Sequence, residues 1–238
     1  MSAVAAALEA TWPAAAVHRA GPWAVREGRG GGRRVSCATA EGDWTAADIA
    51  LAEAAQAALG QPSLFMLRAG ETALDAALEA AGYAVEEPVR LWSGAIAALA
   101  VEPPPLTAFT IWPPMEIQRA IWAGGGIGPA RLAVMERAPA PKAAILARAG
   151  DRPCGAAFAC VHGGIAVVHA LHVAPAFRRR GAARAMMGRA AVWAQAQGAE
   201  ELALAVTAAN TAAGRLYASL GMAIVGQCHY RRKTPPEA

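Results

Sequence analysis

The stretch that decides the fold of the second part of the chain is Pro175-Ala176-Phe177-Arg178-Arg179-Arg180-Gly181-Ala182-Ala183. It follows the apolar run 165–173, which predicts a buried strand, and it opens a predicted helix of about residues 180–197. A helix start presents backbone N–H groups without partners, and these groups can hold an anion. The arginines add positive charge, and Gly181 lets the backbone approach a bulky ligand. The stretch therefore predicts an anion-binding turn.

The sequence around this turn predicts short helices and a meander of strands. Proline and glycine clusters separate apolar runs of strand length, and Ala183, Met187, Ala190 and Ala194 form one core-facing stripe along the helix. The predicted helices are Met115–Trp122, Pro129–Glu136 and Asn210–Leu220. The predicted strands are Ala143–Ala149, Cys154–Val161, Ile165–Val173 and Leu202–Val206, with a last strand or hairpin over Met222–Arg232.

Two motifs, in order and with one strand between them, resemble those of the GNAT superfamily of acyl-CoA-dependent N-acyltransferases. The first is Val173-x-Pro175-x-x-Arg178-x-x-Gly181-x-Ala183. The second is Asn210-x-x-Ala213-x-x-Leu216-Tyr217-x-x-x-Gly221-Met222, which is similar to the family's Asn-x-x-Ala-x-x-x-Tyr-x-x-x-Gly-Phe pattern. The resemblance covers about residues 108–232. It implies an α/β (α+β) fold with a mixed, mostly antiparallel central sheet flanked by helices.

The first half carries a fainter copy of the second motif. Glu71-x-x-Leu74 leads to Gly82-Tyr83 at the spacing by which Asn210 leads to Gly221. In that register Leu78 stands where the second half has Tyr217, and no Arg-x-x-Gly-x-Ala precedes the predicted helix 46–59. Three successive prolines, 103–105, mark a linker. We therefore expect a tandem chain, with a degenerate GNAT-like domain at 1–103 and a catalytic domain at 104–238.

The resemblance also implies roles for individual residues. The turn would hold the pyrophosphate of acetyl-CoA, and Tyr217 would protonate the departing thiolate, a role open to a phenol with a pKa near 10. Asn210 would cap its helix, with or without a contact to the coenzyme. The preceding strand would splay from its neighbour, so that backbone groups of Leu171 and Val173 meet the pantetheine arm. The full set expected to bind the coenzyme is Leu171, His172, Val173, Arg178, Arg179, Arg180, Gly181, Ala182, Ala183, Arg184, Asn210, Ala213 and Tyr217.

The candidate for the general base is His169, because histidine titrates near neutral pH. By resemblance it matches one of two histidines on the proton path of serotonin N-acetyltransferase, and Val167 stands at the other position. Strand alternation places His169 on one face with Leu171 and Val173, and His172 on the opposite face. A buried structural histidine is the alternative for His169. His162 and His229 are further candidates for the base.

Composition limits the remaining possibilities. The chain has 238 residues, a formal net charge of +4 and four cysteines without a Cys-x-x-Cys pair, and no spacing of metal ligands occurs. We expect a cytoplasmic monomer or homodimer with no metal and no membrane or nucleic-acid partner. The glycine-rich segment 28–34 lacks the ending of a phosphate loop, which favours a hairpin turn.

The sequence thus predicts an N-acetyltransferase that passes an acetyl group from acetyl-CoA to a primary amine by direct attack. The expected acceptor is a small-molecule amine or the amine of a peptide or protein. The alternatives are a non-catalytic acyl-CoA-binding sensor or regulatory protein, and a transferase that uses a longer acyl group.

Overall fold

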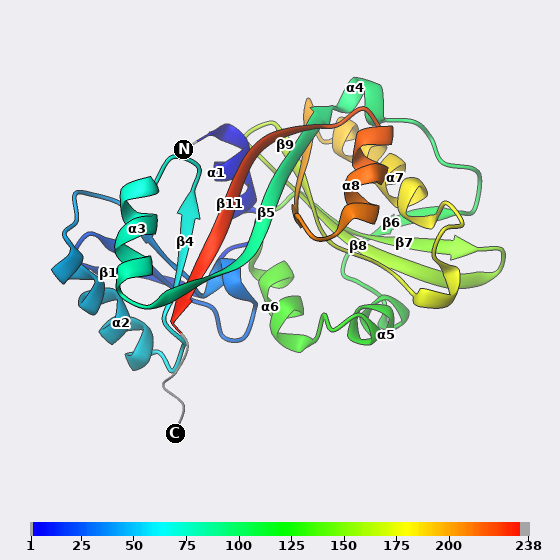
Figure 1. Ribbon diagram of the computed structural model, residues 1–238. Helices are drawn as coiled ribbons and strands as arrows, with labels where there is room; N and C mark the ends of the chain where they lie inside the picture. The colour runs from blue at the N-terminus through cyan, green and yellow to red at the C-terminus, as the bar shows by residue number, and fades with distance from the viewer. Residues whose placement is uncertain (1, 234–238) are drawn as a thin grey trace. The chain divides into compact units, whose positions relative to one another are not determined.

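The computed structural model describes residues 2–233, which form two compact units (Figure 1). The larger unit comprises residues 2–13, 91–206 and 210–225, and the smaller unit comprises residues 14–90, 207–209 and 226–233. Strands β5 (Tyr83–Ala95) and β11 (Ala223–Lys233) each contribute residues to both units. In the described part of the chain, no helix has the length and apolar character needed to cross a membrane.

The larger unit is built around the consecutive strands β6 to β10, in the spatial order β10-β9-β8-β7-β6. Neighbouring strands are antiparallel except β9 and β10, which are parallel. The strands are β6 (Ala108–Ile111), β7 (Lys142–Ala149), β8 (Arg152–His162), β9 (Ile165–Val173) and β10 (Glu201–Thr207). The helices are α1 (Ala3–Ala10), α4 (Ile96–Leu99), α5 (Glu116–Gly124), α6 (Pro129–Arg137), α7 (Ala182–Ala196) and α8 (Thr211–Ser219). The mixed, mostly antiparallel sheet flanked by helices agrees with the fold class expected from the sequence.

Helix α7 packs on one face of this sheet, and α5 lies on the other face (Figure 1). The predicted stripe is confirmed at Met187, Ala190 and Ala194, which are buried, whereas Ala183 is only half-buried. Small side chains allow a close approach: a Cβ on Gly188 would lie 2.6 Å from the carbonyl oxygen of Val101. A glycine inside this helix therefore has a packing reason despite its low helix propensity.

The smaller unit has a second sheet region, with the strand order β1-β2-β3-β4-β11. Its core includes Trp23, Phe65, Leu74, Leu78 and Tyr83. Strands β2 and β3 are antiparallel neighbours, which confirms that the glycine-rich segment 28–34 lies in a hairpin connection. Its elements are β1 (Ala16–Ala20), β2 (Trp23–Glu27), η1 (Arg33–Val35), β3 (Ala38–Ala40), η2 (Ala46–Asp48), α2 (Ile49–Ala58), β4 (Leu64–Arg68) and α3 (Thr72–Ala80).

The compact units do not divide at residue 103, because each unit includes a segment from the other half of the sequence. The end of β5 and helix α4 supply Trp92, Ile96 and Leu99 to the core of the larger unit. Conversely, residues 228–232 of β11 pair with β4 inside the smaller unit. The C-terminal segment is thus one long strand and not a hairpin, because its partner is a strand from the first half.

Because each unit contains segments from both halves of the sequence, we predict that residues 104–238 do not fold when produced alone. The fragment lacks Val4, Leu8, Trp92, Ile96 and Leu99, all buried in the larger unit. Burial of each such side chain stabilises by about 1.5–3 kcal/mol, and the summed loss reaches the entire stability of a typical domain, roughly 5–15 kcal/mol. We expect no cooperative thermal unfolding transition by circular dichroism, and recovery of the transition when residues 1–103 are co-expressed. A cooperative transition in the fragment alone would show that the exchanged segments are dispensable.

Candidate active site

The turn between β9 and α7 has the features of an anion site. A 3-10 turn, η3 (Pro175–Phe177), leads to Arg179 and Gly181, whose φ angles are +63° and +86°. Helix α7 begins at Ala182, two residues later than predicted, because Gly181 is its left-handed N-cap residue. The hydrogen bond that closes its first turn runs from the Ala185 N–H to the Gly181 carbonyl, at 2.9 Å. The N–H groups before Ala185 therefore lack helical acceptors, and the turn contains no acidic residue and no side-chain cap.

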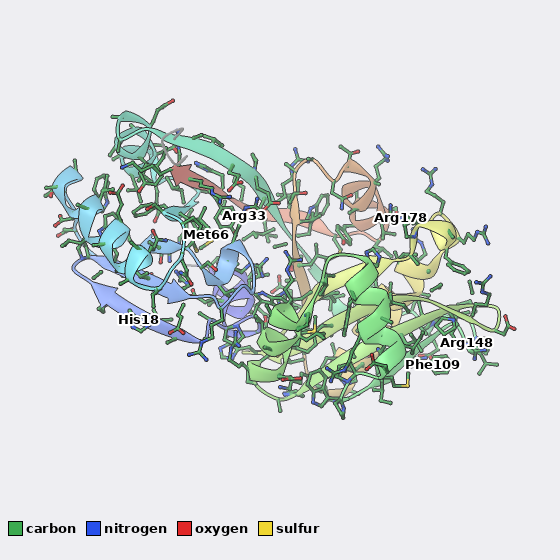
Figure 2. All side chains as sticks on the ribbon, turned by 90° about the horizontal axis from the view of Figure 1, so that it is seen from below. His18, Arg33, Met66, Phe109, Arg148 and Arg178 are labelled. Atoms are coloured by element: carbon green, nitrogen blue, oxygen red, sulfur yellow. The ribbon has the colours of Figure 1, made fainter. Side chains whose placement is uncertain are left out.

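The side chains of the four arginines at 178, 179, 180 and 184 are exposed. The Nε of Arg178, which Figure 2 labels, donates to the Val173 carbonyl at 3.2 Å. Arg184 donates to the Ser219 hydroxyl at 2.6 Å, and so links the first turn of α7 to α8. The Arg180 guanidinium lies 6.0 Å from the Phe177 ring centroid. A Cβ placed on Gly181 would meet no atom of the described residues within 4 Å. The space and the charge of the turn fit a pyrophosphate group.

A β-bulge interrupts strand β9 just before this turn. His169 pairs with Phe158 of β8 and His172 pairs with Ala156, so β9 spans three residues where β8 spans two. Ala170 has a φ of +51°, and its carbonyl accepts a hydrogen bond of 2.8 Å from the buried indole of Trp122 on α5. The bulge lies on the segment from which the sequence predicts coenzyme contacts.

Because of the bulge, the predicted assignment of side chains to the two faces of the sheet is wrong. Leu171 and Val173 pack with α7, on the face that also carries Ala166 and Val168. His169 instead lies with Trp12 and Phe158 on the opposite face. His172 is on that opposite face as well, because it abuts Gly125 at the end of α5. The extra residue reverses the alternation after Ala170, and it therefore brings the two histidines to the same face.

The two histidines have different surroundings. His169 is 7% exposed, and its Nε2 lies 2.8 Å from the Thr11 hydroxyl. Since that hydroxyl donates its single proton to the Ala7 carbonyl at 2.6 Å, Nε2 must carry the proton of this hydrogen bond. His172 is half-buried, and burial together with the charge of Arg178 lowers its pKa. His172 is therefore neutral at pH 7, the form in which an imidazole accepts a proton.

Strands β9 and β10 separate beyond their first residues. Their parallel pairing joins residues 165–167 to residues 201–203, whereas the strands continue to Val173 and Thr207. The predicted splay is thus present in the pairing pattern. It opens after Val167, toward the end of β9 that carries the bulge and leads into the turn before α7.

The second motif lies on helix α8, which also belongs to the larger unit. Asn210 is its N-cap residue and accepts a hydrogen bond of 3.1 Å from the Ala213 N–H, so the predicted cap is confirmed. Tyr217 is 5% exposed, and burial raises its pKa to about 12. Its ring centroid lies 6.0 Å from that of Trp92. At neutral pH the phenol stays protonated and can act only as a donor of that proton or as a hydrogen-bonding group.

Other sequence-predicted candidates lie apart from this arrangement. His162 ends β8, and His229 belongs to the smaller unit, where it contacts Asp75 at 2.9 Å. Among residues 2–233, no group of three or more His, Cys, Asp or Glu side chains is arranged to hold a metal ion. Sequence reasoning missed Thr11 and Trp12, which contact His169 from more than 150 residues away. No local pattern marks such a contact.

Comparisons with known proteins agree with this architecture. Residues 114–222 match the model of the acetyltransferase (GNAT) family. The fold is similar to a GCN5-related N-acetyltransferase from Kribbella flavida, with a TM-score of 0.69 and 20% identity over 94% of this chain and 91% of that one. A functionally unknown conserved protein from Staphylococcus epidermidis is also similar, with a TM-score of 0.69 and 11% identity over 96% of each chain.

A tandem GNAT protein from the clavulanic acid biosynthesis pathway is a further structural relative. Its TM-score is 0.61 and its identity 12%, over 84% of this chain and 76% of that one. No curated protein sequence matches the chain significantly. The family match spans α5 to α8 with the bulged strand, the turn and Tyr217, and the fold likeness extends over most of the remaining chain. Residues 114–222 of this chain thus carry the acetyltransferase (GNAT) domain.

Proposed function

We propose that the chain transfers an acetyl group from acetyl-CoA to the primary amine of an acceptor. The observation that carries the proposal is the presence of three features in the larger unit: a turn at 178–184 whose N–H groups lack helical acceptors, the separation of β9 from β10, and the buried phenol of Tyr217. The turn is proposed to hold the pyrophosphate, and the gap between the two strands is proposed to admit the pantetheine arm. The residues proposed to bind the coenzyme are those expected from the sequence, in particular Arg178–Arg184, Asn210 and Ala213.

In the proposed reaction the neutral amine attacks the thioester carbonyl directly. The new C–N bond forms, the C–S bond breaks, and the thiolate takes its proton from Tyr217. The proton of the amine leaves through the histidines of the α5 face. His169 is the base predicted from the sequence, and His172 is the second candidate, favoured by its greater exposure and lowered pKa. The backbone N–H of Leu171, at the bulge, is proposed to polarise the thioester carbonyl.

The proposal assigns one coenzyme site to the chain. In the smaller unit, β3 and β4 are also parallel and pair only at Ala38 and Phe65. There the Arg68 side chain bridges the strand ends, with donations to the Ala40 carbonyl at 3.2 Å and to Glu41 at 3.0 Å. Leu78, at the position corresponding to Tyr217, is a buried core residue. These contacts support the interpretation of the first half as a degenerate GNAT-like copy without a coenzyme.

The pH dependence of kcat/KM distinguishes the roles of His169 and His172. Because the pKa of His172 is lowered, we expect the fall of kcat/KM at acid pH to begin below about 6.5, the usual pKa of histidine. His172→Gln is expected to lower kcat/KM by roughly 10²-fold and to remove this acidic limb. His169→Gln serves as the comparison and should keep the limb. An acidic limb that persists in His172→Gln and vanishes in His169→Gln would return the role of base to His169.

The direct test of the function is release of free coenzyme A thiol from acetyl-CoA across a library of small amines and peptides. Transfer is expected to at least one class of primary amine, with the acetylated product identified by mass spectrometry. The same library with longer acyl donors tests the alternative of a longer acyl group. Tight binding of acetyl-CoA without transfer to any amine would instead favour the non-catalytic sensor.

A further inference from the structure

Trp92 packs directly beneath the helix that carries Tyr217. It lies near the end of β5, is 6% exposed, and tilts by 57° against the Tyr217 ring at a centroid distance of 6.0 Å. A Cβ on Gly214 would lie 3.6 Å from Trp92 Cζ2, an atom on the nitrogen-bearing side of the indole. Gly214 and Tyr217 are three residues apart on α8 and therefore share one face. The nitrogen side of the indole thus faces the turn of α8 that presents the phenol.

The indole N–H of Trp92 is buried and has no hydrogen-bond partner among the described residues. An indole nitrogen can only donate, and buried donors in folded proteins are nearly always paired. By contrast, the indole N–H groups of Trp23 and Trp122 donate to the carbonyls of Asp48 and Ala170. The N–H of Trp92 is therefore a donor without an acceptor among residues 2–233, the neutral Tyr217 hydroxyl included, and the indole ring lies beside the ring of the proposed acid.

The proposed reaction generates a hydrogen-bond acceptor beside Trp92. When Tyr217 protonates the thiolate, its oxygen becomes a phenolate inside a buried site. Burial disfavours that charged form and raises the pKa of the phenol to about 12, well above the ~8.5 of a cysteine-like thiol. A nearby N–H dipole stabilises the developing negative charge and so makes proton donation easier.

We propose that Trp92, supplied by the first half of the sequence, is a positioning residue that holds Tyr217 in place and supports its phenolate with the indole N–H. The inference rests on the proposed function, in which Tyr217 is the acid. It also gives the first half a part in catalysis, because a residue outside the matched range 114–222 acts on a residue within it.

The test replaces Trp92 by phenylalanine, which keeps an aromatic ring and removes the N–H. We expect kcat to fall about tenfold, the size associated with one hydrogen bond to a charged group, and the dissociation constant of acetyl-CoA to stay within about twofold. Trp193→Phe is the matched control, because Trp193 on α7 packs against the same core. It should leave both quantities unchanged. If Trp92→Phe does not fold, benzothienylalanine at position 92 removes the N–H and preserves the bicyclic shape.

A double-mutant cycle separates this role from simple packing. In a Tyr217→Phe background, Trp92→Phe should change kcat by less than about twofold, since Trp92 acts through the phenol. A tenfold loss that persists in this background, or wild-type kcat for Trp92→Phe, would overturn the proposal for Trp92 while leaving Tyr217 as the acid. Wild-type activity of Tyr217→Phe itself would overturn both.

Discussion

Gly181→Glu is expected to weaken acetyl-CoA binding by about 100-fold or more, which corresponds to about 2.7 kcal/mol. Two effects combine at this position. The φ of +86° is strained for any residue with a Cβ, and the new carboxylate stands at a helix start proposed to hold a pyrophosphate. Calorimetric titration of acetyl-CoA into the variant measures the loss directly.

Gly198→Glu is the matched control for this substitution. Gly198 follows the other end of α7 and has a φ of +80°, and a Cβ added there would likewise meet no described atom within 4 Å. Both variants carry the same added charge and a similar backbone strain, so their melting temperatures should fall by comparable amounts. Only Gly181→Glu should lose affinity. Equal affinities of the two variants for acetyl-CoA would contradict the proposal that this turn binds the pyrophosphate.

Tyr217→Phe is expected to reduce kcat by roughly 10²-fold or more, the usual contribution of a general acid. The pKa of about 12 keeps the phenol protonated at neutral pH, so the wild-type protein holds the proton that the proposed reaction passes to the thiolate. Phenylalanine retains the packing against Trp92 but has no proton to give. Steady-state kinetics together with calorimetry should show a loss in kcat and an acetyl-CoA dissociation constant within about twofold of wild type.

Tyr83→Phe controls for the removal of a buried tyrosine hydroxyl. Tyr83 belongs to the core of the smaller unit, where its hydroxyl donates to Glu53 at 2.7 Å. Its loss should lower stability by about 1–3 kcal/mol and leave kcat unchanged. If Tyr217→Phe keeps full activity, the thiolate is protonated by another group or by water, and Tyr217 is only a core residue.

The sequence was sufficient to predict most elements of the larger unit. Strand β9 has the predicted bounds, and α6, β7, β8 and β10 differ from their predicted ranges by one or two residues at one or both ends. Apolar periodicity and glycine or proline at the ends carry this information locally. Asn210 was predicted to cap α8 for the same reason, since a cap depends only on the residues that follow it.

The bulge at Ala170 was not predictable in this way. The run Val167-Val168-His169-Ala170-Leu171 contains no glycine, and its irregularity appears only against β8, which supplies one residue fewer. One extra residue reverses the side-chain alternation, so the faces assigned to Leu171, Val173 and His169 relative to one another were wrong. The Thr11–His169 contact and the pairing of β11 with β4 were missed for a related reason, because both depend on segments distant in sequence.

The number of acetyl-CoA molecules bound per chain tests the central claim most directly. One pyrophosphate-binding turn is proposed in the larger unit, whereas the Arg68 side chain bridges the ends of the corresponding strand pair in the smaller unit. Calorimetric titration of the full chain is therefore expected to give a stoichiometry of one, with full competition by free coenzyme A. Absence of binding would contradict the assignment of the turn, and two sites per chain would contradict the degenerate first half.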